Sequence, residues 1–134
     1  MLDPTQVPPV SSEELLARFI VFSKHIRSSN MTVKPDAFIP HPHIELSVTR
    51  HRDATEDELW QEGERVAALR SATLYGKADV TAGAFEDEDL SVVAKPIAPN
   101  PNHADVIDWP ADKPAQKMKA LEIANKAVFV PRPH

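Results

Sequence analysis

Alternation of apolar and polar residues marks the clearest strand in the chain. Between residues 44 and 50, Ile44, Leu46 and Val48 alternate with polar side chains, the period of two that a half-buried strand shows. Residues 34–40 fit an edge strand, because their prolines cannot donate to a central ladder. Further strands are predicted at residues 73–80, 90–97, 103–109 and 128–130.

Helical spacing of apolar residues first appears near the N-terminus. Ser11 and Glu14 have the spacing of a capping box, in which each side chain satisfies a backbone donor. The apolar stripe that begins at Leu15 then predicts a first helix, which ends near Arg27.

Two later helices also begin at capping residues. Thr55 and Glu58 form a second capping box, and the helix that follows is expected to reach about Arg70. Asp112 caps a last helix over residues 113–126.

The predicted order of elements is α-β-β-α-β-β-β-α-β, with residues 81–89 as a short helical turn or an acidic loop. This order lacks the regular alternation of a β-α-β series. We therefore expect an α+β fold in a single domain, with a mixed or antiparallel sheet of about four to six strands. About three helices would pack on one side of this sheet.

Length and composition indicate where the domain begins and ends and which chemistry is excluded. The chain has 134 residues, which suits one domain, and its thirteen prolines against three glycines indicate stiff connections. We expect residues 1–10 to be a disordered lead, residues 11–130 the domain and residues 131–134 a C-terminal tail. The absence of cysteine excludes disulfides, thiolate metal sites and cysteine nucleophiles.

The N-terminal sequence lacks the basic start and apolar core of a signal peptide, and no apolar run has the length of a membrane span. We therefore expect a cytoplasmic protein that does not interact with membranes.

Charge is distributed unevenly along the chain. Residues 18–52 hold six basic and two acidic residues, a net charge of +4, whereas residues 53–90 hold three basic and eleven acidic residues, a net charge of −8. The overall charge of −5 argues against non-specific nucleic-acid binding. The basic region still allows a local site for an anionic ligand or an acidic partner.

His41, His43 and Glu45 are weak candidates for metal ligands. If the strand extends back to His41, these residues lie on one face at alternate positions. Two imidazoles and a carboxylate are suitable ligands for zinc or iron. The alternative is the solvent face of a strand that follows a proline turn, and overall we expect no metal and no cofactor.

The end of the same strand offers candidates for anion binding. Arg50 and Arg52 carry the guanidinium groups that bind phosphate or carboxylate, and Ser47 lies nearby on the strand. His51 is a candidate acid or base near neutral pH. Ser47 lacks the glycine-rich elbow of a serine hydrolase, and a charged strand end is the alternative interpretation.

His103 is a second candidate acid or base. It follows a Pro-Asn-Pro-Asn loop and shares a strand face with Asp105. A structural histidine that binds the loop backbone is the alternative.

Three segments in this order resemble a family of small uncharacterised bacterial proteins. They are Glu45-Leu-Ser-Val-Thr-Arg50, Glu58-Leu-Trp60 and His103-Ala-Asp-Val-Ile-Asp-Trp-Pro110 with Asp112-Lys113. The resemblance covers roughly residues 15–130 and departs at Asp108, where the family pattern leads us to expect glycine. The resemblance implies a protein of the bacterial cytosol, and it implies no particular activity.

Two functions remain open from the sequence. The first is a non-enzymatic binding or accessory module that acts on a protein partner through the polarised surface. The alternative is a small enzyme or ligand-binding protein for a phosphorylated or nucleotide-like molecule, which uses Arg50, His51 and His103.

Overall fold

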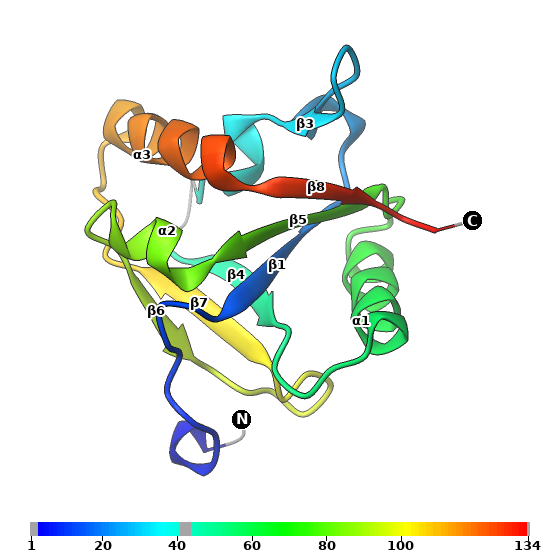
Figure 1. The fold of residues 1–134 in the computed structure, drawn as a ribbon, viewed down its shortest axis with the longest axis vertical. Coiled ribbons are helices and arrows are strands. Elements are labelled where there is room, and N and C mark those ends of the chain that lie inside the picture. Colours follow the sequence, from blue (N-terminus) through cyan, green and yellow to red (C-terminus); the bar gives the residue numbers. More distant parts are fainter. Residues whose placement is uncertain (1–2, 41–43, 134) are drawn as a thin grey trace.

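The computed structural model describes residues 3–40 and 44–133 and contains one six-stranded antiparallel sheet (Figure 1). The strand order is β6-β7-β4-β1-β5-β8. The strands are β1 (Leu15–Ile20), β4 (Leu46–Arg50), β5 (Gly76–Thr81), β6 (Ser91–Ala94), β7 (His103–Ile107) and β8 (Val128–Pro131). A separate hairpin pairs β2 (Ile26–Arg27) with β3 (Thr32–Val33).

Three α-helices and three single turns of 3-10 helix complete the described chain. The helices are α1 (Glu56–Leu69), α2 (Ala82–Glu86) and α3 (Lys113–Lys126). The 3-10 turns are η1 (Pro4–Gln6), η2 (Ser23–His25) and η3 (Pro35–Phe38). The predicted α+β class, with an antiparallel sheet and three helices, is confirmed.

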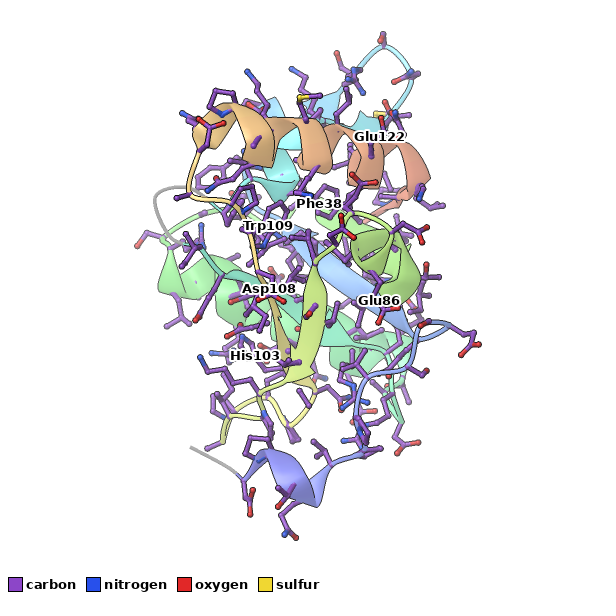
Figure 2. All side chains as sticks on the ribbon, turned by 90° about the vertical axis from the view of Figure 1, so that its left-hand side faces the viewer. Phe38, Glu86, His103, Asp108, Trp109 and Glu122 are labelled. Carbon is purple, nitrogen blue, oxygen red and sulfur yellow. The ribbon has the colours of Figure 1, made fainter. Side chains whose placement is uncertain are left out.

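One face of the sheet holds the main core. Its buried residues include Leu16, Ile20 and Val48 from central strands, and α2, α3 and η3 cover them. Figure 2 shows Phe38 of η3 and Trp109 beneath α3. Trp109 is a buried core residue, and its indole N–H donates to the carbonyl of Val106 at 3.0 Å.

Helix α1 lies against the opposite face of the sheet, so the expectation that all helices share one side is wrong (Figure 1). Ala67 of α1 packs with Leu74 and Phe19 in a second, smaller apolar cluster. The approach is close, because a Cβ on Gly63 would lie 2.9 Å from side-chain atoms of both Leu74 and Phe19. Phe19 points to this face because its neighbours in β1 point to the main core.

The predicted first helix is wrong, because Leu15–Ile20 forms β1, a central strand between β4 and β5. A central strand is covered on both faces, so its apolar residues need not alternate and can imitate helical spacing. One of the two hydrogen bonds of the predicted capping box is present in a turn, where the Ser11 N–H donates to the Glu14 carboxylate at 3.3 Å. The other carboxylate oxygen of Glu14 binds Arg50, which lies in the neighbouring strand.

The predicted edge strand over residues 34–40 is also wrong. Pro35 begins η3, where Ala37 and Phe38 are buried against α3 and the sheet. Proline suits the first position of a helical turn, since its missing N–H would have no partner there. The prolines therefore mark a turn that inserts into the core.

Both later capped helices are confirmed. The Thr55 hydroxyl accepts from the Glu58 N–H at 3.1 Å, and the Glu58 carboxylate accepts from the Thr55 N–H at 2.9 Å. Asp112 accepts from the Ala115 N–H at 3.0 Å at the start of α3. The strands predicted around residues 44–50, 73–80, 90–97, 103–109 and 128–130 correspond to β4, β5, β6, β7 and β8. The turn predicted at residues 81–89 contains α2.

Asp108, where we expected glycine, has a backbone φ of 72°. This left-handed conformation favours glycine, and aspartate tolerates it better than most other residues. The Asp108 carboxylate also accepts a hydrogen bond from the Ser91 hydroxyl at 2.7 Å. The position therefore has a backbone geometry that glycine would adopt without strain.

The expected disordered lead and the C-terminal tail both have contacts to the domain where the structure describes them. The Pro8 carbonyl accepts a hydrogen bond from Arg50 at 2.9 Å. The Arg132 N–H donates to the Tyr75 carbonyl at 3.0 Å. Within residues 3–40 and 44–133, no helix is long and apolar enough to cross a membrane.

Candidate functional site

Strands β1 and β4 diverge after a short paired stretch. They pair at Leu16 with Arg50 and at Ala17 with Thr49, whereas β1 continues to Ile20 beside β5 alone. Arg18 bridges the resulting gap, because its Nη1 donates to the Ser47 carbonyl of β4 at 3.0 Å. Its Nε donates to the Ala37 carbonyl of η3 at 2.9 Å. The guanidinium thus replaces backbone donors that an unbroken ladder would supply.

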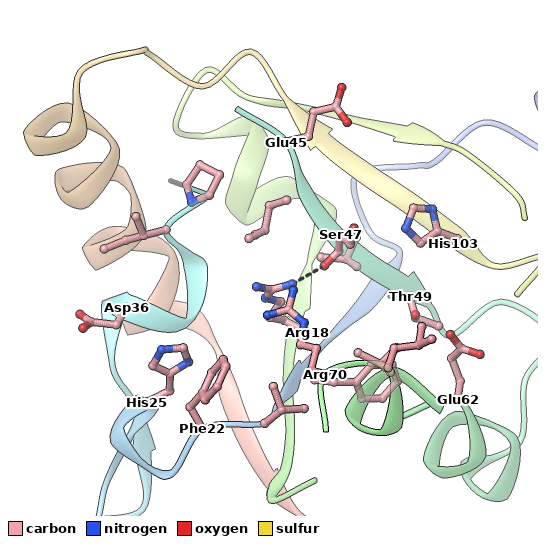
Figure 3. A pocket seen from close by; sticks show the side chains of 18 of the residues that line it. Arg18, Phe22, His25, Asp36, Glu45, Ser47, Thr49, Glu62, Arg70 and His103 are labelled. Carbon is pink, nitrogen blue, oxygen red and sulfur yellow. Dashed lines mark hydrogen bonds between the residues drawn. The ribbon is translucent and has the colours of Figure 1, made fainter. Parts of the chain in front are cut away.

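A cleft of about 810 Å³ lies at this gap. Its floor comes from β1 and β4, and its walls come from η2, η3, the last turns of α1 and the first turns of α3. Figure 3 shows Arg18 and Arg70 in the middle of the cleft. His25 and Asp36 lie toward one wall, and Thr49 and Glu62 lie toward the other.

The cleft is basic although the whole chain is acidic. Six basic side chains line it: Arg18, Lys24, Arg65, Arg70, Lys113 and Lys117. Three acidic side chains line it: Asp36, Glu45 and Glu62. With histidine neutral this leaves a net charge of +3 in the lining, against −5 for the chain. Such a concave basic surface attracts anions.

In the described part of the chain, the two central guanidinium groups lack a carboxylate partner. Arg65 is paired with Glu62, with Nε donating to Oε1 at 2.8 Å. No carboxylate within the described ranges forms an ion pair with Arg18 or Arg70. Burial, together with the nearby charge of Arg70, lowers the pKa of Arg18 to about 10. Arg18 therefore remains cationic at neutral pH, in a place where its charge is poorly solvated.

His25 belongs to the same cleft. Its ring packs against the ring of Phe22 in an edge-to-face arrangement, with the ring centroids 5.3 Å apart. Burial lowers the pKa of His25, the charges of Arg18, Lys24 and Arg70 lower it further, and Asp36 acts in the opposite direction. His25 is therefore neutral near pH 7.

Apolar side chains supply the rest of the lining. Phe19 and Val66 lie at the α1 side, and Phe22, Ile39 and Ile97 line other parts of the cleft. A cleft with apolar walls and a few converging polar groups is the usual form of a small-molecule site.

Arg50, a predicted ligand-binding residue, lies instead in the core. Its side chain is 1% exposed. Two of its nitrogens bind the Glu14 carboxylate, with Nη2 donating to Oε2 at 3.0 Å, and Nη1 donates to the Pro8 carbonyl. These contacts use Arg50 to fix the N-terminal segment to the sheet.

His51 and Arg52 also have partners inside the protein. His51 Nε2 lies 3.0 Å from Asp79, which also accepts from the buried Lys77 at 2.7 Å. Arg52 Nε donates to the Asn102 side chain at 3.2 Å. Arg52 lines a second hollow of about 470 Å³, and this hollow shares Thr49 with the basic cleft. The structure therefore does not bring Arg50, His51 and Arg52 together around one cavity.

Ser47 and His103 do line the basic cleft. His103 Nδ1 lies 2.9 Å from the Lys95 carbonyl, and its Nε2 lies 3.6 Å from Asp105. No hydrogen bond joins His103 to Ser47 in the described structure, so the two do not form a nucleophile–base pair. The expected alternative for His103, a histidine that binds the loop backbone, fits these contacts.

Of the weak metal candidates, Glu45 is exposed and lies 3.7 Å from the Lys95 ammonium. His41 and His43 lie outside the described residues. Within residues 3–40 and 44–133, no group of three metal-ligating side chains occurs.

Sequence reasoning missed Arg18, Arg70 and His25. Arg18 falls within the predicted first helix, and Arg70 falls at the expected end of the helix that begins after Thr55. A cation that interrupts the apolar run Leu15–Ile20 was the available signal, because an arginine inside a buried strand must be paired or must face a cavity. No protein-family model, curated protein or solved structure matches the chain.

Proposed function

We propose that this protein binds a small anionic ligand, with a phosphate or carboxylate group, in the basic cleft. The observation that carries the proposal is the Arg18 guanidinium, which is half-buried at the cleft floor and has no carboxylate partner among the described residues. A poorly solvated cation is costly unless an anion approaches it. An incoming oxyanion would remove this cost, and guanidinium is the side chain best suited to bind it.

The size and lining of the cleft support a small molecule as the ligand. Its volume of about 810 Å³ lies in the range of ligand pockets, roughly 300–1,000 Å³. The anionic group would lie between Arg18 and Arg70, and an apolar part of the ligand would contact Phe22 and Ile39. We propose binding rather than catalysis, since Ser47 and His103 do not form a hydrogen-bonded pair.

A protein partner is the second candidate. Leu69 and Phe22 line the cleft with 74% and 39% of their surface exposed, which gives the cleft an apolar rim. An acidic segment of a partner would place a carboxylate at Arg18 and apolar side chains on this rim. For either candidate we propose a bacterial cytoplasmic setting, and no interaction with nucleic acid or membrane.

The first test is Arg70→Gln, with inorganic sulfate and phosphate as probes. Arg70 is exposed, and its side chain makes no hydrogen bond to another described residue, so the variant should fold as the wild type does. We expect about a tenfold loss of sulfate affinity, because an exposed charge-assisted contact contributes about 1.4 kcal/mol. Isothermal titration calorimetry measures this loss.

Lys126→Gln is the matched control, because it removes one exposed positive charge outside the cleft lining. Its sulfate affinity should equal that of the wild type. Equal affinities for wild type, Arg70→Gln and Lys126→Gln would contradict the proposed site. If the site is supported, native mass spectrometry of the untagged protein from a lysate separates the two candidates, because a bound small molecule and a bound polypeptide differ in added mass.

A further inference from the structure

His25 is placed as a third polar group of the basic cleft. Its main chain is fixed on both sides, because its N–H donates to the Phe22 carbonyl at 3.0 Å and its carbonyl accepts from the Lys34 N–H at 2.8 Å. Neither ring nitrogen hydrogen-bonds to another described residue. The ring therefore has both nitrogens available inside a cleft that also holds Arg18.

Charged groups from four elements act on this imidazole. Arg18 of β1, Arg70 at the end of α1 and Lys24 of η2 are positive, and Asp36 of η3 is negative. Positive charge exceeds negative charge around the ring, so the empty cleft disfavours the imidazolium form. A bound dianion would reverse this balance.

We propose that His25 contacts the bound anion and takes up a proton when the anion binds, so that the cleft selects doubly charged oxyanions such as a terminal phosphate over singly charged ones. This inference rests on the proposed function and names the ligand's charge and one of its contacts. A neutral imidazole offers one N–H donor, whereas the imidazolium offers two donors and a full charge. A dianion gains more from that charge than a monoanion does.

The sign of the pH dependence follows from linkage. In the empty cleft, burial first and the charge of Arg18 next hold the pKa of His25 below its ordinary value of 6.5. A bound dianion raises this pKa, so the complex holds the proton over a pH range in which the empty protein does not. Affinity is therefore constant at high pH, rises as the pH falls through the higher pKa of the complex, and levels off below the pKa of the empty protein.

Sulfate is the probe for the test, because it stays doubly charged across the range from pH 5.5 to 8.5. Calorimetry in two buffers of different ionisation enthalpy measures both the affinity and the proton uptake. We expect sulfate affinity to rise about tenfold for each unit by which binding raises the pKa of His25. Dimethyl phosphate, a single negative charge, should show a smaller rise.

His25→Gln is compared with His51→Gln, because His51 lies outside the cleft lining and bonds to Asp79. His25→Gln should retain sulfate binding at pH 8.5 and lose the pH dependence and proton uptake. His51→Gln should bind sulfate as the wild type does. If the pH dependence survives in His25→Gln or disappears in His51→Gln, the inference is overturned.

An NMR titration of the His25 ring in the wild-type protein gives a second measurement that needs no variant. We expect sulfate to move its titration midpoint to higher pH. An unmoved midpoint, with sulfate still bound, would overturn the role of His25 and leave the proposed function intact. Absence of sulfate binding at every pH would instead overturn the proposed function itself.

Discussion

Arg50 and Arg18 lie on adjacent strands of the same sheet and meet opposite environments. Arg50 is almost wholly buried and binds the Glu14 carboxylate with two nitrogens. Arg18 is half-buried and binds two main-chain carbonyls, those of Ala37 and Ser47, with no carboxylate partner in the described chain. The first charge is neutralised inside the fold, and the second is left facing a cleft.

This difference shows how to separate structural from functional cations. A buried charge that is already paired contributes to stability only through its partner, and it has little to offer a ligand. A charge held by carbonyls is positioned but not neutralised, so a ligand completes its environment. If burial were the criterion for a ligand-binding arginine, Arg50 would be chosen. The lack of a carboxylate partner among the described residues identifies Arg18 instead.

The largest effect is expected for Arg50→Ala. It removes the guanidinium that pairs with the Glu14 carboxylate and donates to the Pro8 carbonyl, and breaking a buried ion pair costs about 3–5 kcal/mol. Urea denaturation measures this loss of unfolding free energy, and sulfate affinity of the folded fraction should not change. Arg52→Ala is the control, because Arg52 is more exposed and its ion-pair partner Asp53 is 89% exposed. A small stability loss together with a loss of sulfate binding would reverse the roles of Arg50 and Arg18.

Lys77 extends the comparison to a second buried cation, which is also paired. Asp79→Asn removes the carboxylate that binds both Lys77 and His51, and we expect a loss of about 2–3 kcal/mol in unfolding free energy. Burial raises the pKa of Asp79, but the hydrogen bonds from His51 and Lys77 outweigh it and hold this pKa below 3.8.

The folded-state pKa of Asp79 is thus lower than its unfolded value. Its contribution to stability is complete above pH 3.8 and is lost as the pH falls through the folded-state pKa. The stability difference between wild type and Asp79→Asn should therefore shrink in acid denaturation series below pH 3.8. A difference that stays constant down to pH 2 would exclude this ion pair as its cause.

The smallest change in stability is expected for Arg18→Gln, which sharpens the contrast with Arg50. The variant loses hydrogen bonds to Ala37 and Ser47, but it also removes a poorly solvated charge, so the unfolding free energy should change by about 1 kcal/mol or less. Sulfate binding should be lost, because the central cation of the cleft is gone. Calorimetry and urea denaturation on the same preparation give both values. Retained sulfate affinity would exclude Arg18 from the site.

Local signals in the sequence predicted the elements whose stability is local. The capping box before α1 and the N-cap before α3 need only neighbouring residues, and β4 is indicated by its own alternation. The two helices were predicted correctly because backbone donors near a helix start are satisfied within one turn. The α+β class followed from their order along the chain.

The first predicted helix failed for a tertiary reason. The segment Leu15–Ile20 satisfies helical spacing as well as strand burial, and only its position between β4 and β5 decides between them. Glu14 shows the same competition, because its carboxylate serves a local turn and also binds an arginine in another strand. The basic cleft was not predicted for the same reason, because a helix at residues 15–20 would not direct Arg18 toward β4.

The sequence by itself determined the class of fold, two capped helices and the best strand of the sheet. It also determined that residues 18–52 hold six basic and only two acidic residues, in a chain that is acidic overall. Only the tertiary structure decided which of them is neutralised, because Glu14 and Arg50 are 36 residues apart and meet through strand pairing. The sequence determines which side chains are charged, but the ion-pair partner and the solvation of each charge depend on the folded surroundings. Partner and solvation distinguish the structural Arg50 from the ligand-facing Arg18.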